Sequence, residues 1–155
     1  MARQLRSVGL DFADTAPVRL VFTGTMGAPP DAVYRALAIE TESWPEWFSG
    51  LTAATAAPEG RTVRLTGGTR FQETVLAAQP DVLYAYRTDE TNAPGVHALL
   101  EAWRLAPSGG GTRVRWTVAT DGSAPYRTVL RLSRPAMGRT FRASVRALDR
   151  RLTRA

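Results

Sequence analysis

The sequence has 155 residues and a mass of 16.9 kDa, with 44% hydrophobic and 22% charged residues, as expected for one ordinary folded domain. It has no cysteine and no lysine, which excludes disulfides, thiolate nucleophiles, zinc–thiolate sites and Schiff-base chemistry. No apolar run approaches the roughly 18 residues needed to cross a bilayer, and the N-terminus lacks the apolar core of a secretory signal. We therefore expect a soluble, cytoplasmic protein.

The net charge of +6 is concentrated near the C-terminus. Residues 127–154 contain nine arginines and one acidic residue, Asp149, which gives this segment a charge of +8. The rest of the chain has eleven arginines and thirteen acidic residues, and so a charge of −2. The basic character therefore belongs to one element.

The first half of the chain predicts one strand followed by two short helices. Residues 1–15 are expected to be loosely held, so the domain proper covers 16–155. Residues 18–26 are rich in β-branched and apolar side chains and predict a strand. The Pro29-Pro30-Asp31 sequence suits a helix start, which predicts a short helix over 32–38. A second short helix or turn is expected at 42–48, where three aromatics are close together, Trp44, Trp47 and Phe48.

From residue 51 onward the pattern changes to short alternating segments separated by turns rich in glycine, proline, asparagine and aspartate. This spacing is typical of an antiparallel meander. The predicted strands cover 51–57, 61–66, 69–78, 82–88, 96–105 and 112–120.

The segment 125–154 has helical periodicity, with apolar and basic residues on opposite sides. Pro135 should kink or divide this helix, because proline cannot continue an interior hydrogen-bond ladder. The element order, an α+β arrangement, suggests a sheet wrapped around one helix. The apolar side carries Phe141, Val145, Leu148 and Leu152, and the basic side carries Arg139, Arg142, Arg146 and Arg150.

Alternation along the strands predicts which side chains point inward, since neighbouring residues face opposite sides of a sheet. For 96–105 the face containing His97 is favoured over the alternative face from Ala98 to Arg104. The predicted inward residues are Phe71, Glu73, Val75 and Ala77; Val82, Tyr84 and Tyr86; His97, Leu99, Glu101, Trp103 and Leu105; and Val114, Trp116 and Val118.

Several motifs together resemble the SRPBCC superfamily (START-like, birch-pollen-allergen-like), and its polyketide cyclase/dehydrase-type members in particular. They are APPDAVYRALA and ESWPEWFSG within 28–50, TRFQETVLAAQPDVLYAYR at 69–87, EAWRLAPSGGGTRVRWTV at 101–118, and RLSRPAMGRTFRASVRALDRRL near the C-terminus. The resemblance covers roughly residues 16–153. It implies a helix-grip fold, in which a curved seven-stranded antiparallel sheet wraps around a long C-terminal helix and encloses a ligand cavity. It transfers no reaction, because the superfamily has no universal catalytic motif.

We therefore expect the protein to bind a small hydrophobic molecule, polyketide- or lipid-like, in an apolar cavity with a few polar groups. A carboxyl desolvated there could move protons in a cyclisation or dehydration, with Glu73, Glu101 and His97 as candidates. Structural roles remain open for all three; Glu73, for example, could pair with Arg104 or Arg87. The expected ligand-binding residues are Trp44, Trp47, Phe48, Phe71, Tyr84, Tyr86, Leu99, Trp103, Trp116, Met137 and Phe141.

Two other functions stay open: a non-catalytic carrier of lipids or metabolites, and an interaction module. The latter would dock an acidic protein or an anionic surface through the arginine face at 139, 142, 146 and 150, although a solvated outer helix face is the favoured interpretation of these arginines. We expect no metal and no cofactor, because the ligands and phosphate-binding motifs they require are missing from the sequence. Nucleic acid is an unlikely partner, since no aromatic residues alternate with the arginines.

Overall fold

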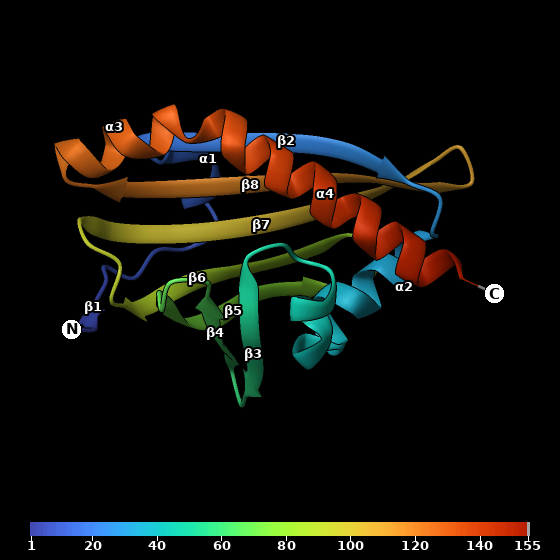
Figure 1. Cartoon of the computed structure of the whole chain (residues 1–155), viewed down its shortest axis with the longest axis horizontal. Helices are drawn as coiled ribbons and strands as arrows, with labels where there is room; N and C mark the ends of the chain where they lie inside the picture. The colour runs from blue at the N-terminus through green and yellow to red at the C-terminus, as the bar shows by residue number, and fades with distance from the viewer. Residues whose placement is uncertain (155) are drawn as a thin grey trace.

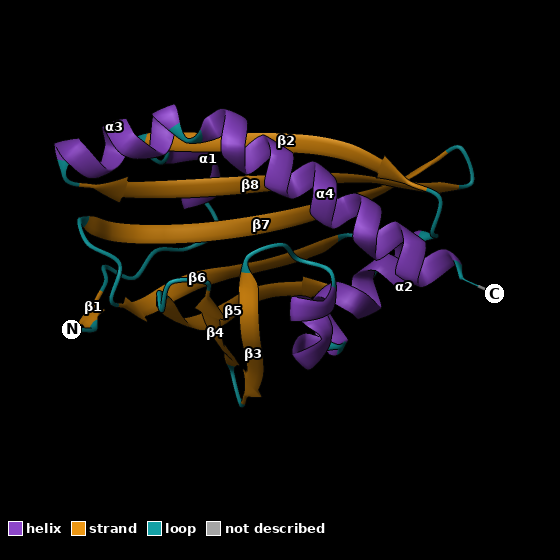
Figure 2. Cartoon of the chain, in the orientation of Figure 1, coloured by secondary structure: helices purple, strands orange, loops and turns teal. Residues whose placement is uncertain are grey.

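The computed structural model describes residues 1–154, which form a curved antiparallel sheet with a helical layer across its concave face (Figures 1 and 2). Seven strands follow one another in the order β2-β8-β7-β6-β5-β4-β3, and a short β1 pairs with β6. The C-terminal helices run along β2 and β8 on one side of the molecule (Figure 1). This arrangement confirms the predicted fold class.

The strands are close to the predicted ranges, because the turn residues between them fix where pairing stops. All neighbouring strands along the sheet are antiparallel. Their bounds are β1 (Arg3–Gln4), β2 (Val18–Met26), β3 (Leu51–Ala57), β4 (Gly60–Leu65), β5 (Arg70–Gln79), β6 (Leu83–Thr91), β7 (Val96–Ser108) and β8 (Gly111–Gly122).

Two short helical stretches follow β2, as predicted. Helix α2 (Pro30–Tyr34) begins at a proline and continues into a π-helical turn, η1 (Arg35–Ile39). A 3₁₀ helix, η2 (Thr41–Glu46), comes next and carries Trp44. The indole N–H of Trp44 donates to the carbonyl of Leu37 at 3.0 Å, which ties η2 to η1 and buries the ring beneath them.

The C-terminal helical segment is divided into α3 (Ala124–Leu132) and α4 (Arg134–Thr153). Pro135 causes this division: it lies in the first turn of α4, where its missing N–H leaves no hydrogen bond unmade. The predicted faces are confirmed, with Phe141, Val145 and Leu148 buried and the four arginines of the basic face exposed. At Gly24 of β2, a Cβ atom would lie 3.3 Å from the Phe141 ring, so glycine permits α4 to approach the sheet closely.

The N-terminal residues are held against the sheet, which corrects the expectation of a loosely held segment 1–15. Strand β1 pairs with β6, and the amide of Arg6 donates to the carbonyl of His97 at 2.9 Å. A short helix, α1 (Phe12–Thr15), then buries Phe12 on the convex face. This segment is held because the convex face of β6 and β7 is apolar there. Phe12 packs on it and shields four side chains from water: Ala85, Ala98, Leu100 and Ala102.

Two β-bulges alter the predicted facing of individual residues. A register shift between Val96 and Ala98 turns His97 outward and brings Val96 to the concave face. A shift between Val75 and Ala77 moves Ala77 to the convex face, where it packs near Phe12. Val82 precedes β6 and is 48% exposed. A bulge adds one residue to a strand and so reverses the alternation beyond it.

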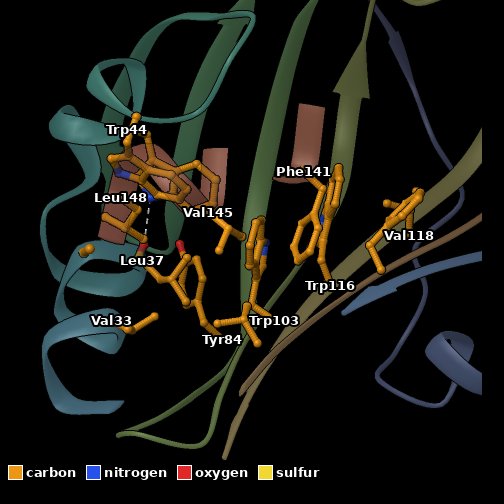
Figure 3. Close-up of a cluster of buried hydrophobic side chains, with 14 of the residues drawn as sticks. Val33, Leu37, Trp44, Tyr84, Trp103, Trp116, Val118, Phe141, Val145 and Leu148 are labelled. Atoms are coloured by element: carbon orange, nitrogen blue, oxygen red, sulfur yellow. Dashed lines mark hydrogen bonds between the residues drawn. The ribbon is translucent and has the colours of Figure 1, made fainter. Parts of the chain in front are cut away.

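Aromatic rings pack one end of the concave face solidly (Figure 3). Trp103 stacks on Trp116 with ring centroids 5.3 Å apart, and Trp116 stacks on Phe141 of α4 at 5.9 Å. Trp44 meets Trp103 edge to face at 5.6 Å. Offset and edge-to-face pairs of this kind add stability beyond the area they bury.

We expect replacement of Phe141 by alanine to destabilise the fold by about 3–5 kcal/mol, because the ring is 1% exposed and its removal leaves a cavity among large aromatics. Urea unfolding monitored by circular dichroism measures this loss. Ile39→Ala, at a side chain that is 59% exposed, is the control and should change stability by no more than about 0.5 kcal/mol. Equal effects of the two substitutions would contradict the assignment of Phe141 to the core.

Candidate functional site

A cavity of about 300 Å³ occupies the part of the concave face that the aromatic rings leave unfilled. Its walls come from the η2 region, strands β3 to β8, helix α3 and the first turn of α4, and they are overwhelmingly apolar. The lining residues are Trp44, Phe48, Leu51, Arg61, Val63, Leu65, Phe71, Glu73, Tyr86, Ala93, Val96, Leu99, Glu101, Trp116, Val118, Tyr126, Leu130 and Met137.

The cavity lies beneath α3 and the start of α4, not beneath the middle of the long helix. The central residues of α4, including Phe141 and Val145, are buried and pack against the aromatic rings at the filled end of the concave face. Tyr126 and Leu130 of α3 and Met137 of α4 supply the helical wall of the cavity. The break near Pro135 therefore separates a helix that covers the cavity from one that packs on the core.

An ion pair between Arg61 of β4 and Glu73 of β5 lies in the cavity wall. The two residues are cross-strand partners, and Arg61 Nε donates to Glu73 Oε1 at 2.6 Å. Both side chains are almost completely buried, at 3% and 2% exposure. The guanidinium carbon lies 4.1 Å from the Trp44 ring centroid and 4.5 Å from that of Tyr86. Arg61 Nη1 is buried without a hydrogen-bond partner among residues 1–154.

A second carboxyl, Glu101 of β7, faces the same cavity within a hydrogen-bonded group of aromatic residues. Its Oε1 accepts from Trp116 Nε1 at 2.9 Å and from the Tyr86 hydroxyl at 3.2 Å. The Tyr86 hydroxyl in turn accepts from Trp103 Nε1 at 3.3 Å. These donors fix the position of Glu101 Oε1 on rigid strands.

Burial shifts the protonation of both carboxyls in the same direction. It raises the pKa of Glu73 to about 7, against the lowering influence of Arg61 and with a further rise from nearby Glu101. Burial also raises the pKa of Glu101, which Arg61 and the Trp116 and Tyr86 hydrogen bonds partly oppose. The pKa of the Tyr86 hydroxyl is raised well above its ordinary value by burial and by Glu101, so this group acts as a hydrogen donor.

The charges of the cluster decide what it can do chemically. One guanidinium faces two carboxyls, so the cluster has a net charge of −1 if both carboxyls are ionised. Since an uncompensated charge is unfavourable in an apolar cavity, one proton is retained between the two carboxyls near neutral pH. The proton belongs to the pair of carboxyls and not to one residue, because the charge of Glu101 raises the pKa of Glu73. A protonated carboxyl beside an ionised one is an acid/base pair.

The structure brings together most of the predicted ligand-binding set. Of these residues, Trp44, Phe48, Phe71, Tyr86, Leu99, Trp116 and Met137 line the cavity. The others are buried in the packing around it, where Trp47 is 3%, Trp103 1%, Phe141 1% and Tyr84 3% exposed. Trp47 therefore belongs to the packed core, and Trp44 lies between this core and the cavity.

Of the three candidate catalytic residues, Glu73 and Glu101 line the cavity and His97 does not. His97 is exposed on the outer face because of the bulge at Val96, which strict alternation along the strand could not reveal. The predicted partners of Glu73 were also wrong: Arg104 is exposed, and Arg87 pairs with Asp89 at 2.9 Å.

Arg61 is the charged cavity residue that the sequence analysis did not predict. The alternating pattern of the segment 61–66 contained the signal, because Arg61 shares its face with Val63 and Leu65. An arginine at the end of a predicted strand is ordinarily read as solvated. The other lining residues that were not predicted are Leu51, Val63, Leu65, Ala93, Val96, Tyr126 and Leu130.

The fold and the cavity define this protein as a helix-grip domain, and comparison with known proteins agrees. Residues 17–153 match the family described as polyketide cyclase / dehydrase and lipid transport. The chain belongs to this family. The family and the apolar cavity together support hydrophobic ligand binding at a general level.

An uncharacterized protein of Mycobacterium tuberculosis strain H37Rv is 32% identical over 150 residues, covering 92% of this chain and 89% of its own length. Among solved structures, a START superfamily protein from Mycobacterium smegmatis aligns with a TM-score of 0.69 at 12% identity, over 86% of this chain and 96% of that one. The Zhui aromatase/cyclase from Streptomyces sp. R1128 aligns with a TM-score of 0.70 at 22% identity, over 89% and 96%. These structural matches establish the shared fold.

We expect Arg61→Met to cost about 3–5 kcal/mol of folding stability near neutral pH, since it leaves Glu73 buried without its cation. The double variant R61M/E73M should be more stable than R61M, because both charges are then removed together. Urea unfolding of the three proteins measures the difference. A double variant that is less stable than R61M would contradict the direct ion pair between Arg61 and Glu73.

Stability should fall as the pH rises from about 5 to about 8. The carboxyls hold their proton more tightly in the folded chain, where the pKa of Glu73 is about 7, than in the unfolded chain, where it is near 4.5. Their stabilising contribution is therefore complete at low pH and is lost as the pH rises through the folded-state pKa. Glu101→Gln should reduce this fall, and Glu59→Gln, at an exposed carboxyl, is the matched control. Identical pH profiles for all three proteins would contradict the shared proton.

Proposed function

We propose that the cavity binds a small, mainly apolar molecule, polyketide- or lipid-like, which carries one polar group that meets Arg61, Glu73 and Glu101. The observation that carries this proposal is the combination of an apolar cavity of about 300 Å³ with one compact cluster of ionisable groups in its wall. Small-molecule sites in proteins have this composition, in which apolar contacts provide affinity and a few polar groups fix orientation.

The unpartnered donor of Arg61 supports a hydrogen-bond acceptor on the ligand. A buried N–H without a partner is unfavourable, and a carbonyl or hydroxyl oxygen of a bound molecule would satisfy it. The guanidinium is held between two aromatic rings and by Glu73, so it is already oriented before a ligand arrives. This preorganisation lowers the cost of binding.

The two carboxyls support acid/base chemistry on that ligand. In an aldol cyclisation or a dehydration, the ionised carboxyl would take a proton from a carbon next to a carbonyl. The protonated one would donate a proton to the carbonyl or departing hydroxyl oxygen. Arg61 would stabilise the negative charge that develops on oxygen. A raised pKa near the working pH suits both steps. A protein that shares this fold, Zhui, is described as an aromatase/cyclase.

A non-catalytic carrier is the second candidate, and the almost entirely apolar lining favours it. A carrier needs the same apolar contacts, and the ion cluster would then only orient the ligand. The two functions differ in whether the carboxyls convert the bound molecule into a product. A measurement of ligand turnover therefore distinguishes an enzyme from a carrier, whereas a measurement of binding affinity does not.

We expect Val118→Phe to abolish or greatly weaken binding of the neutral apolar probe N-phenyl-1-naphthylamine, since the added ring fills the cavity. Val129→Phe is the matched control, because Val129 is 63% exposed and lies outside the lining. Probe fluorescence measures binding, and native mass spectrometry of gently purified protein identifies any retained molecule. Unchanged probe binding by Val118→Phe would remove the cavity as the binding site.

Glu73→Gln and Glu101→Gln should retain probe binding within a few fold, because the apolar lining is intact. On any molecule that the wild-type protein converts, they should lower kcat by about 10²-fold or more. Chromatography of the retained molecule after incubation measures conversion. Full turnover by both variants would exclude the carboxyls from catalysis and leave the carrier function.

A further inference from the structure

The charged groups in the wall of the cavity are two carboxyls and one guanidinium. Within residues 1–154, Arg61, Glu73 and Glu101 are the charged residues that line it. The segment 127–154 carries +8, yet the helical wall of the cavity consists of Tyr126, Leu130 and Met137. The arginines of α3 and α4 therefore bring no second positive charge to this site.

The single guanidinium is already engaged by protein groups. Arg61 Nε donates to Glu73 Oε1 at 2.6 Å. The guanidinium carbon lies 4.1 Å from the Trp44 ring centroid and 4.5 Å from that of Tyr86. Transfer of Arg61 to a ligand carboxylate would leave Glu73, which is 2% exposed, without its cation, and this is strongly unfavourable. A further charge that acts on Glu73, that of Asp89, is also negative and raises the pKa of Glu73.

The second carboxyl has one oxygen left for a ligand. Both hydrogen bonds that Glu101 accepts, from Trp116 Nε1 and from the Tyr86 hydroxyl, go to Oε1, and none from residues 1–154 goes to Oε2. A ligand hydroxyl suits Oε2 in either state, because it donates to an ionised carboxyl and accepts from a protonated one. A hydroxyl oxygen also accepts from a guanidinium N–H such as Arg61 Nη1, which is buried without a partner in the described chain.

We propose that the cavity selects neutral ligands with a hydroxyl group and rejects apolar molecules that end in a carboxylate. This inference rests on the proposed function and narrows its ligand class. A bound carboxylate would place a third carboxyl beside one guanidinium, and the additional negative charge in an apolar cavity has to be removed by uptake of one more proton. An ordinary carboxyl has a pKa of about 4, so this protonation lowers the affinity by about 10³-fold at about pH 7. A neutral hydroxyl needs no such proton.

Two ligands of the same shape, 2-naphthamide and 2-naphthoate, differ in charge and so test this selectivity, and 2-naphthol represents the proposed class. Displacement of N-phenyl-1-naphthylamine from the full chain measures their dissociation constants. At about pH 7.5, 2-naphthol and 2-naphthamide should bind with similar affinity, and 2-naphthoate about 100-fold or more weakly. Between about pH 8 and about pH 6, the affinity for 2-naphthoate should rise by about tenfold or more, because its binding takes up a proton. The affinities for the two neutral ligands should change by less than about threefold.

The double variant E73Q/E101Q should reverse the preference. It leaves Arg61 as the one charge of the cluster, so that a ligand carboxylate completes an ion pair. It should therefore bind 2-naphthoate about tenfold or more tightly than the wild type does. The matched control is E46Q/E59Q, which removes two exposed carboxyls outside the lining and should bind all three ligands as the wild type does. If E73Q/E101Q does not fold, the pH series on the wild type decides alone.

Equal affinity of the wild type for 2-naphthamide and 2-naphthoate at about pH 7.5 would overturn the selectivity. The same pH dependence for both ligands, or unchanged 2-naphthoate binding by a folded E73Q/E101Q, would overturn it as well. Val118→Phe separates these results from a failure of the proposed function. If the fluorescent probe binds to the wild type and not to Val118→Phe, the cavity is the binding site and only its selectivity is in question. If both proteins bind the probe equally, the proposed function fails and the selectivity fails with it.

Discussion

Trp116 has a position on which both the core and the cavity depend. Its ring stacks against both Trp103 and Phe141 of α4, and these two rings lie 6.1 Å from each other, so the three rings form one group that anchors the helix to the sheet. Its indole N–H donates to Glu101 Oε1, which orients the carboxyl in the cavity. The same residue therefore closes the packed end of the concave face and bounds the open end. The cavity remains open because the aromatic rings of β8 and α4 are fixed by their mutual packing. The aliphatic side chains that line the rest of the concave face are too short to fill the space.

The ionisable groups of the cavity constrain one another in a similar way. The single positive charge of Arg61 can neutralise Glu73 or Glu101 but not both. The remaining negative charge is therefore removed by a retained proton or compensated by a polar group of a ligand. The aromatic rings around Arg61 and the indole and phenol donors to Glu101 hold these groups on neighbouring strands. A buried ionic cluster adds little to stability when compared with apolar packing. Its presence in an otherwise apolar cavity supports the proposed contact with the polar group of a bound molecule.

The helical layer divides into two parts with different tasks. Helix α4 buries Phe141, Val145 and Leu148, and its Ser144 hydroxyl accepts from the backbone amide of Ser49 at 2.9 Å. Helix α3 has no buried residue and rests over the cavity with half of its apolar face outward. The break at Pro135 lets the two helices differ in this way.

From residue 16 onward, the sequence alone determined the element order, the approximate strand ranges, the division of the last helix and the two faces of α4, whereas β1 and α1 were not predicted. These follow from local causes: turn residues, proline geometry and the 3.6-residue period. It also indicated Glu73, Glu101 and most of the aromatic lining. Tertiary structure decided the rest. The bulges that turned His97 and Ala77 away arise from pairing between strands, and the partner of Glu73 depended on which strand lies beside β5. Whether an aromatic residue fills the core or lines the hollow, as with Trp103 and Trp116, depends on how rings from distant segments stack, which no local pattern encodes.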